Sequence, residues 1–291
     1  MKLFSKQIAQ LNLHNRAYRN FVEQLLEFLL QADLGSGDLT TQLLQNPQRK
    51  IEAKVIAKSA GILAGAEEVA FFWRKHGVKI LAAKKDGAKI KVGETVFALS
   101  GPAAKILTTE RVGLNLLSRM SGIATAAEKL AHKIGRRKFA ATRKTPLGLL
   151  DSRAVVVGGG LPHRLNLADQ ILVKENHRAV ESEVWKRLLD SRLRGDKVFE
   201  IEADSPKLAL TIATHFAKNK NLILMLDNFS VGEFRKTAAT IRKINPRIIL
   251  EASGGIDEKT ASKLLTAGAD FVSLGRLTNS SGVVDFSLRI I

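Results

Sequence analysis

The sequence predicts an α/β fold whose larger part is a parallel sheet covered by helices. From Thr108 onward, short apolar runs alternate with helical segments, which is the pattern of a parallel sheet with helices outside it. Before Thr108, short β-prone runs are separated by glycine turns, which indicates a smaller, separate sheet. The glycines of GGGLPHR do not follow the G-x-G-x-x-G spacing of a dinucleotide site, so we expect the parallel sheet to curve into a barrel.

The first hundred residues contain a helix, a glycine-rich break and the small sheet. Apolar residues recur at helical spacing from Phe21 to Leu30, and the segment 35–41 (GSGDLTT) ends that helix. Residues 51–100 alternate β-prone runs with glycine turns and hold one helix at about 66–76. Gly101-Pro102 ends this region.

The rest of the chain begins with a long helix from Thr108. Thr109 is its expected N-cap, and Glu110 suits the first turn. Six strands are expected after it, at 139–142, 171–174, 198–202, 222–226, 248–252 and 271–275. The helices expected between them include 184–189, 207–217, 231–244 and 258–267.

Composition limits the function classes. The chain has 291 residues and no cysteine, which excludes disulfides and thiolate metal sites. No apolar run approaches the ~18 residues of a membrane span, and the N-terminus lacks the apolar stretch of a signal peptide, so we expect the cytoplasm. The net charge of +18 permits nucleic-acid binding, but the cations are spread along the chain and only 5% of residues are aromatic. We therefore consider nucleic acid an improbable partner, and a positive field also suits anionic substrates.

Polar residues gather where the expected strands end, and in an α/β barrel these ends form the active site. The loop between the first two strands adds His163 and Arg164. The residues at the strand ends are Thr142, Arg143, Lys144, Lys174, Glu202, Asp227, Ser253, Gly254, Gly255, Ser273, Gly275 and Arg276.

These residue types indicate two kinds of ligand. Guanidinium groups bind planar carboxylates bidentately, so Arg143 and Arg164, with Arg111 as a third candidate, suit a substrate with two carboxylates. The carboxylates of Glu202 and Asp227 can accept hydrogen bonds from ribose hydroxyls or hold Mg²⁺. Glycine turns beside a helix start bind phosphate. The set therefore predicts that the ligands are a small anionic acid and a phosphorylated ribose. The sequence contains no P-loop, H-E-x-x-H or G-x-S-x-G motif that would indicate another catalytic site.

The motifs as a whole resemble the quinolinate phosphoribosyltransferase family. The resemblance covers nearly the whole chain and lies in runs such as ATRKTPLGLL, GGGLPHRLNLAD, ILVKENH, MLDNFS, EASGGI and VSLGRLTNSSGVVDFSL. It implies type II phosphoribosyltransferase architecture: an N-terminal α/β sandwich at 1–108, completed by about 277–291, beside an open α/β barrel at 109–276. It also implies a homodimer, or an assembly of dimers, with shared active sites. Arg111 matches the arginine donated across that interface, and its expected place near a helix N-terminus suits an anion.

The same resemblance assigns roles. Arg143, Lys144, His163, Arg164 and Lys174 would bind quinolinate and the pyrophosphate end of phosphoribosyl pyrophosphate, and Lys144 and Lys174 would stabilise charge in the two chemical steps. Glu202 and Asp227 would hold the ribose, and the glycine turns would hold the 5′-phosphate, with Mg²⁺ neutralising the pyrophosphate. The chain departs from the family pattern at Ala32-Asp33, at Ala141 where the family has Asp, and at Asn279 where it has His.

Four alternatives compete with this prediction. A paralogue associated with molybdate transport would have the same fold, and a nicotinate phosphoribosyltransferase would need fewer guanidinium groups. A charge-driven nucleic-acid-binding protein would show steep salt dependence. A biotinyl-type carrier is suggested by DGAKIKVGETVFAL, which lacks the Met-Lys-Met turn.

Overall fold

The computed structural model describes residues 4–189 and 198–291, which fall into two compact units. The barrel unit consists of residues 1–7, 130–144 and 160–276. The sandwich unit consists of residues 8–129, 145–159 and 277–291. None of the helices in the described ranges combines the length and the apolar character needed to cross a membrane.

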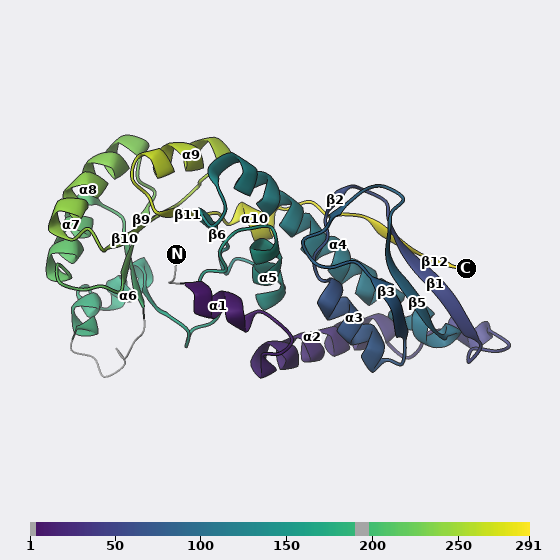
Figure 1. The fold of residues 1–291 in the computed structure, drawn as a ribbon. Helices are drawn as coiled ribbons and strands as arrows, with labels where there is room; N and C mark the ends of the chain where they lie inside the picture. Colours follow the sequence, from purple (N-terminus) through teal and green to yellow (C-terminus); the bar gives the residue numbers. More distant parts are fainter. Residues whose placement is uncertain (1–3, 190–197) are drawn as a thin grey trace. The chain divides into compact units, whose positions relative to one another are not determined.

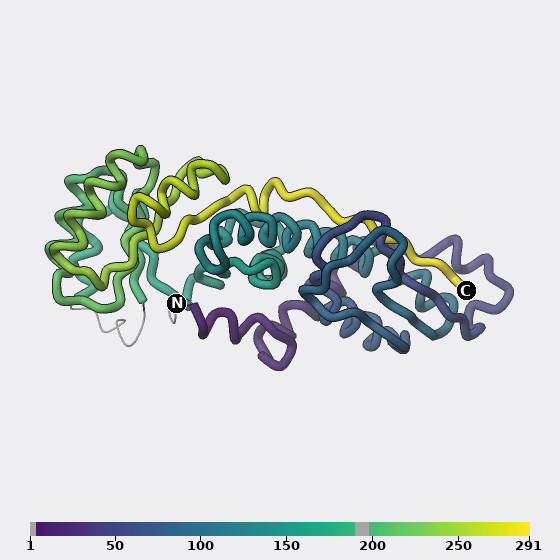
Figure 2. Tube along the Cα trace, turned by 45° about the horizontal axis from the view of Figure 1, so that its top comes forward, coloured from purple at the N-terminus to yellow at the C-terminus, as the bar shows by residue number. Residues whose placement is uncertain are grey.

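The sandwich unit is built on a four-stranded antiparallel sheet in the order β12-β1-β5-β3. Its strands are β1 (Lys50–Ala57), β3 (Lys79–Ala83), β5 (Thr95–Pro102) and β12 (Phe286–Ile290), with β2 (Gly61–Ile62) pairing β4 (Lys89–Ile90). Alternate residues of β1, Ala53, Val55 and Ala57, are buried, which gives the sheet one apolar face. The helices α2 (Arg16–Leu34) and α3 (Ala66–Lys75) confirm the two predicted in this region. In Figure 2 the last strand runs beside the first strands of the unit.

The long helix α4 (Ala103–Ile134) begins before the expected position, so the prediction of Thr109 as its N-cap was wrong. The backbone N–H groups of Ala103 and Ala104 donate to the carbonyls of Arg49 and Pro47, both at 2.9 Å, so the helix needs no side-chain cap. Thr109 instead donates from Oγ1 to the carbonyl of Lys105, one turn earlier in the helix. Arg111 therefore lies well inside α4, and the helix-dipole argument for an anion there does not hold.

The barrel unit contains six parallel strands in the order β6-β11-β10-β9-β8-β7. They are β6 (Phe139–Ala140), β7 (Ile171–Val173), β8 (Phe199–Ala203), β9 (Leu222–Asp227), β10 (Ile249–Ser253) and β11 (Phe271–Ser273), which confirms the six predicted strands. The sheet ends at β6 and β7 and is therefore an open barrel within the described residues. The helices α7 (Pro206–His215), α8 (Val231–Ile244) and α9 (Glu258–Thr266) follow strands β8, β9 and β10 and lie outside them (Figure 1).

Local sequence signals fix where these outer helices begin. Ser205 accepts a hydrogen bond from the N–H of Leu208 in front of α7, and Pro206 occupies the first helical position. Ser230 and Glu233 form a capping box on α8, and the side chain of Asp257 accepts from the N–H of Thr260 on α9. The sequence therefore holds each helix at a fixed point after its strand.

Other elements differ from the sequence prediction. Residues Val184–Leu188 form a 3₁₀ helix, where an α-helix was expected over 184–189. The helices α1 (Ser5–Gln10), α5 (Leu149–Val157), α6 (Glu175–Val180) and α10 (Arg276–Asn279) were not predicted. The run of three valines in α5 favours a strand by propensity, but tertiary burial overrides it. The strand β12 was not predicted either, because it depends on pairing with the distant β1.

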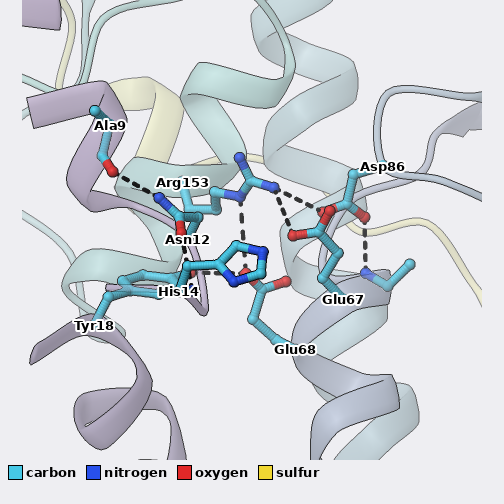
Figure 3. A network of polar contacts seen from close by, with 9 residues as sticks. Ala9, Asn12, His14, Tyr18, Glu67, Glu68, Asp86 and Arg153 are labelled. Carbon is cyan, nitrogen blue, oxygen red and sulfur yellow. Dashed lines mark hydrogen bonds and ion pairs between the residues drawn. The ribbon is translucent and has the colours of Figure 1, made fainter. Parts of the chain in front are cut away.

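A buried network of charges ties α5 to the other helices of the sandwich unit (Figure 3). The guanidinium of Arg153 lies 3.7 Å from Glu68 Oε1, 3.5 Å from Asp86 Oδ2 and 3.2 Å from Glu67 Oε2. The hydroxyl of Tyr18 on α2 donates to Glu68 at 2.9 Å. Burial, and next the charge of Asp86, raise the pKa of Glu68 to about 7. The network thus joins α2, α3 and α5 through one buried carboxyl.

Candidate active site

The candidate site lies along the edge where the six parallel strands of the barrel unit end. Because parallel strands end on the same side of their sheet, residues far apart in sequence meet there. The two outermost strands lead into cations: β6 into Arg143 and Lys144, and β7 into Lys174. The inner strands carry the other groups, which are Glu202 in β8, Asp227 in β9, Ser253, Gly254 and Gly255 at β10, and Ser273, Gly275 and Arg276 at β11.

Two guanidinium groups converge on the β6 side. Leu161 forms an isolated parallel bridge with Ala140, and its carbonyl accepts from the N–H of Ala141 at 2.8 Å, which brings the following loop beside β6. Burial, and next the positive charge of Arg143, lower the pKa of Arg164 in that loop. Arg164 donates from Nη1 to the carbonyl of Gln170 at 3.4 Å, while its buried Nε has no hydrogen-bond partner among the described residues. Two such groups facing one another suit a ligand with two carboxylates.

Two carboxylates from neighbouring strands face one another in the middle of the edge. Glu202 accepts at Oε1 from the N–H of Glu175 at 3.1 Å, and Asp227 accepts at Oδ2 from the side chain of Asn228 at 2.6 Å. Burial raises the pKa of Glu202, the Glu175 N–H opposes this rise, and the charge of Asp227 adds to it. The repulsion between the two carboxylates is relieved by hydroxyl donors or by a cation, so this oxygen pair fits ribose hydroxyls and also Mg²⁺.

The turn after β10 brings two backbones into close approach. Gly254 has a φ of +92°, and a Cβ there would lie 2.1 Å from Asn228 Oδ1 and 2.7 Å from its backbone N. Gly255 has a φ of +55°, with no atom within 4 Å of its Cβ position. Asn228 itself is left-handed, and its N–H donates to the carbonyl of Ser253 at 3.0 Å. The resulting turn precedes α9 and leaves Gly255 exposed, which suits the binding of an anion by backbone N–H groups.

Ser273 lies deeper than the other candidates for the phosphate side. It is buried, and its hydroxyl donates to Glu251 Oε1. Gly275 is half-buried at the start of α10, and Arg276 is exposed. The departure Asn279 is exposed and accepts from the hydroxyl of Ser280. Ala141, which follows β6 and also departs from the family pattern, is fully buried. The next residue, Thr142, accepts at Oγ1 from the N–H of Lys144 at 3.3 Å.

Beneath this edge lies a polar floor, defined as His163, Glu200 and Glu251, which are all buried. His163 Nε2 lies 3.3 Å from Glu200 Oε1 and 3.5 Å from Glu251 Oε1. The sequence prediction included His163 but assigned no role to the two glutamates. Their signal was present, because each stands between apolar residues within a buried strand.

The protonation of the floor follows from two opposing influences. Burial opposes a charge on His163, but the carboxylates of Glu200 and Glu251 outweigh it and raise the pKa of His163 to about 10. Burial and the charge of Glu200 raise the pKa of Glu251 to about 7. The N–H of Arg164, however, donates to His163 Nδ1 at 2.9 Å, which requires a lone pair there. We therefore place the ring proton on Nε2, where it faces both glutamates.

The floor has the residue types of a metal site, since its three ligand atoms lie within 4.8 Å of one another. A metal ion at His163 Nε2 would have to displace the proton that the Nδ1 hydrogen bond places there. Both ring nitrogens are thus engaged within the protein.

Arg111 is not part of the set that the barrel unit assembles. It belongs to the sandwich unit, where it is exposed on α4 with Nη2 at 4.0 Å from Glu110 Oε1. The barrel unit therefore brings together every other residue predicted for the site, with Ser273 and His163 below the rest.

The chain resembles known proteins over most of its length. The family model described as "Quinolinate phosphoribosyl transferase, C-terminal domain" matches residues 123–289, and its N-terminal counterpart matches residues 38–121. A protein of Bacillus subtilis named "Probable nicotinate-nucleotide pyrophosphorylase [carboxylating]" is 35% identical over 279 residues, covering 92% of this chain and 93% of the relative. One of the same name from Archaeoglobus fulgidus is 34% identical over 253 residues, covering 84% and 96%. The solved structure of NadC from Streptococcus pyogenes has a TM-score of 0.81 and 32% identity, covering 93% of this chain and 97% of that chain.

Proposed function

The chain belongs to the quinolinate phosphoribosyl transferase family, and we propose that it makes nicotinate mononucleotide from quinolinate and phosphoribosyl pyrophosphate in NAD biosynthesis. The single observation that carries this proposal is the division of one sheet edge into three parts. In strand order, paired guanidinium groups stand at β6, a left-handed glycine turn follows at β10, and paired carboxylates stand at β9 and β8. In the same order, the three parts suit a pyridine dicarboxylate, a 5′-phosphate and a ribose.

Substrate binding follows from this division. Arg143 and Arg164 bind the two ring carboxylates of quinolinate, since each guanidinium presents two parallel N–H donors to a carboxylate. Lys144 after β6 adds a positive charge beside Arg143. Lys174, half-buried after β7 at the other end of the strand order, adds one close enough to Glu202 to oppose the rise that burial causes in the pKa of that carboxyl. Glu202 and Asp227 accept hydrogen bonds from the ribose hydroxyls. The backbone at Ser253–Gly255 and Gly275, with Arg276, holds the 5′-phosphate.

The reaction then consists of two bond exchanges. The pyridine nitrogen forms a bond to the anomeric carbon of the ribose as the bond to pyrophosphate breaks, and pyrophosphate leaves with the electron pair. The ring nitrogen now carries a positive charge, so the C–C bond to the neighbouring carboxylate breaks, CO₂ leaves, and a proton takes its place on the ring. Lys144 and Lys174 stabilise the negative charges of these steps, and the carboxylates stabilise positive charge on the ribose.

Mg²⁺ is the expected cofactor. The oxygens of Glu202 and Asp227 fit it, because Mg²⁺ is bound through one or two carboxylates together with substrate phosphates and water. When bound, it would supply charge neutralisation of the leaving pyrophosphate.

A homodimer, or an assembly of dimers, would complete the site with Arg111 from a partner subunit. This proposal rests on the exposed position of Arg111 on α4 and on the family's shared sites. Mixing an Arg111→Ala chain with a Lys174→Ala chain should restore activity in the mixed dimer, because one of its two sites holds both native residues. If the mixture stays as inactive as either parent, the site is not shared. The cytoplasmic location stays a prediction.

The test of the function is a comparison of substrates. The purified protein with phosphoribosyl pyrophosphate and Mg²⁺ should form nicotinate mononucleotide from quinolinate, and nicotinate should be a poor substrate because it leaves one guanidinium without a carboxylate. Preference for nicotinate would contradict the proposal, and turnover of neither would favour the molybdate-associated paralogue.

A further inference from the structure

The polar floor is unusual in a barrel interior, which is normally filled by apolar side chains. Glu200 and Glu251 are fully buried, on strands whose other residues are mostly apolar. Burying two carboxylates costs free energy unless each is paired and hydrogen-bonded. An arrangement of this kind persists where it serves the site above it.

Their contacts lead to Arg164 by two routes. In the first, His163 Nε2 faces both glutamates, while its Nδ1 accepts the backbone N–H of Arg164 at 2.9 Å. In the second, Glu200 Oε2 accepts from the side chain of Gln170 at 2.7 Å, and the backbone carbonyl of Gln170 accepts from Arg164 Nη1 at 3.4 Å. The backbone and the guanidinium of Arg164 are thus both held by groups that Glu200 binds.

The conformation of His163 shows that this restraint is needed. Its φ of 57° is left-handed, a region that costs a non-glycine residue of order 1 kcal/mol or more. The ring of Phe4 lies 6.5 Å from that of His163 and packs edge-on against Phe271, which closes the apolar side of the pocket. On its polar side the ring is held between the two glutamates, which lie 3.3 and 3.5 Å from Nε2, and the N–H of Arg164 at Nδ1.

We propose that Glu200 and Glu251 are positioning residues that fix Arg164 through His163 and Gln170, and so determine the affinity for the second carboxylate of the substrate. The inference rests on the proposed function, because it assumes that Arg164 binds a quinolinate carboxylate. His163 then acts through the orientation of Arg164, with both of its ring nitrogens held inside the protein. The carbonyl of Gln170 limits the guanidinium to one direction.

The test is the Glu200→Gln variant. Its amide places an NH₂ donor against another donor, either the ring N–H of His163 or the side-chain N–H of Gln170. We expect the KM for quinolinate to rise about tenfold, because a misplaced guanidinium loses a charge-assisted hydrogen bond. The KM for phosphoribosyl pyrophosphate and kcat should change less than twofold, since Glu202 and Asp227 keep their contacts. Glu251→Gln, made in parallel, should also raise the KM for quinolinate. It replaces Glu200→Gln as the test if that variant fails to fold.

Two controls separate positioning from a general loss of structure. Glu68→Gln neutralises an equally buried carboxyl in the sandwich unit and should leave the KM for quinolinate unchanged. A double-mutant cycle of Glu200→Gln with His163→Asn should give a combined effect close to that of either single variant, because both act through the same contact.

Three outcomes would overturn the inference. These are an unchanged KM for quinolinate, an equally large change in kcat and in the KM values of both substrates, and additive effects in the double-mutant cycle. Failure of the unmodified protein to use quinolinate would instead refute the proposed function, so the two failures are distinguishable.

Discussion

Replacing Gly254 by alanine should damage both the stability and the chemistry of the site. The new Cβ would lie 2.1 Å from Asn228 Oδ1 and 2.7 Å from the Asn228 backbone N, whereas ordinary contact begins at 3.4 Å. Asn228 therefore has to retreat by about 1 Å. Because its side chain donates to Asp227 at 2.6 Å, that shift moves a carboxylate assigned to the ribose.

The magnitudes follow from the strain and the displacement. A left-handed non-glycine residue costs about 1–3 kcal/mol, so the free energy of unfolding should fall by at least this amount. A displacement of about 1 Å at a reacting group costs about 100-fold in rate, so kcat should fall by about that factor. Urea unfolding and steady-state kinetics at saturating substrates measure the two effects.

Gly93→Ala is the matched control. Its φ of +82° carries similar strain, no atom lies within 4 Å of the added Cβ, and Gly93 belongs to the sandwich unit, so Asn228 and Asp227 keep their positions. We expect a loss of about 1–2 kcal/mol in stability with kcat nearly unchanged. A Gly254→Ala enzyme with the kcat of the unmodified protein would refute the reasoning, because Asp227 would then tolerate the shift or play no part.

Two further predictions concern buried charges of the sandwich unit. The pKa of Glu68 is raised from 4.5 to about 7 in the folded protein. Between these two values the folded state keeps a proton that the unfolded chain releases. The free energy of unfolding should therefore fall by up to about 3 kcal/mol as the pH rises from about 4.5 through about 7. Urea unfolding between pH 4.5 and 8 should show this fall in the unmodified protein and a smaller fall in Glu68→Gln. An equal dependence of the free energy of unfolding on pH in the two proteins would contradict the prediction. Asp151 is fully buried and accepts from Arg119 at 2.9 and 2.6 Å, so Asp151→Asn should cost about 3–5 kcal/mol in thermal unfolding. A loss below about 1 kcal/mol would show that the pair contributes little net stability.

The sequence predicted the barrel well because its signals there are local. Each strand is an apolar run followed by polar residues, and Ser230 and Asp257 cap the helices that follow, so both the strands and their polar ends could be located in advance. The position of Arg143, Lys174, Glu202 and Asp227 at one edge of the sheet could be predicted for the same reason, because parallel strands all end at the same edge.

The features that were missed depend on contacts between distant segments. The start of α4 is fixed by the carbonyls of Pro47 and Arg49, which no local pattern in residues 101–110 reveals. The strand β12 exists through its pairing with β1. Glu251 was overlooked because a single charge within an apolar strand gives no sign of its partner, and His163 comes from a loop 88 positions earlier in the numbering.

The most direct test of the central claim is the stoichiometry of one reaction. Quinolinate labelled with carbon-13 in the carboxylate next to the ring nitrogen should be incubated with the purified protein, phosphoribosyl pyrophosphate and Mg²⁺. We predict one labelled CO₂ and one pyrophosphate for each nicotinate mononucleotide formed. Pyrophosphate released without labelled CO₂, or no product that requires both substrates, would contradict the assignment of this sheet edge to quinolinate and the phosphorylated ribose.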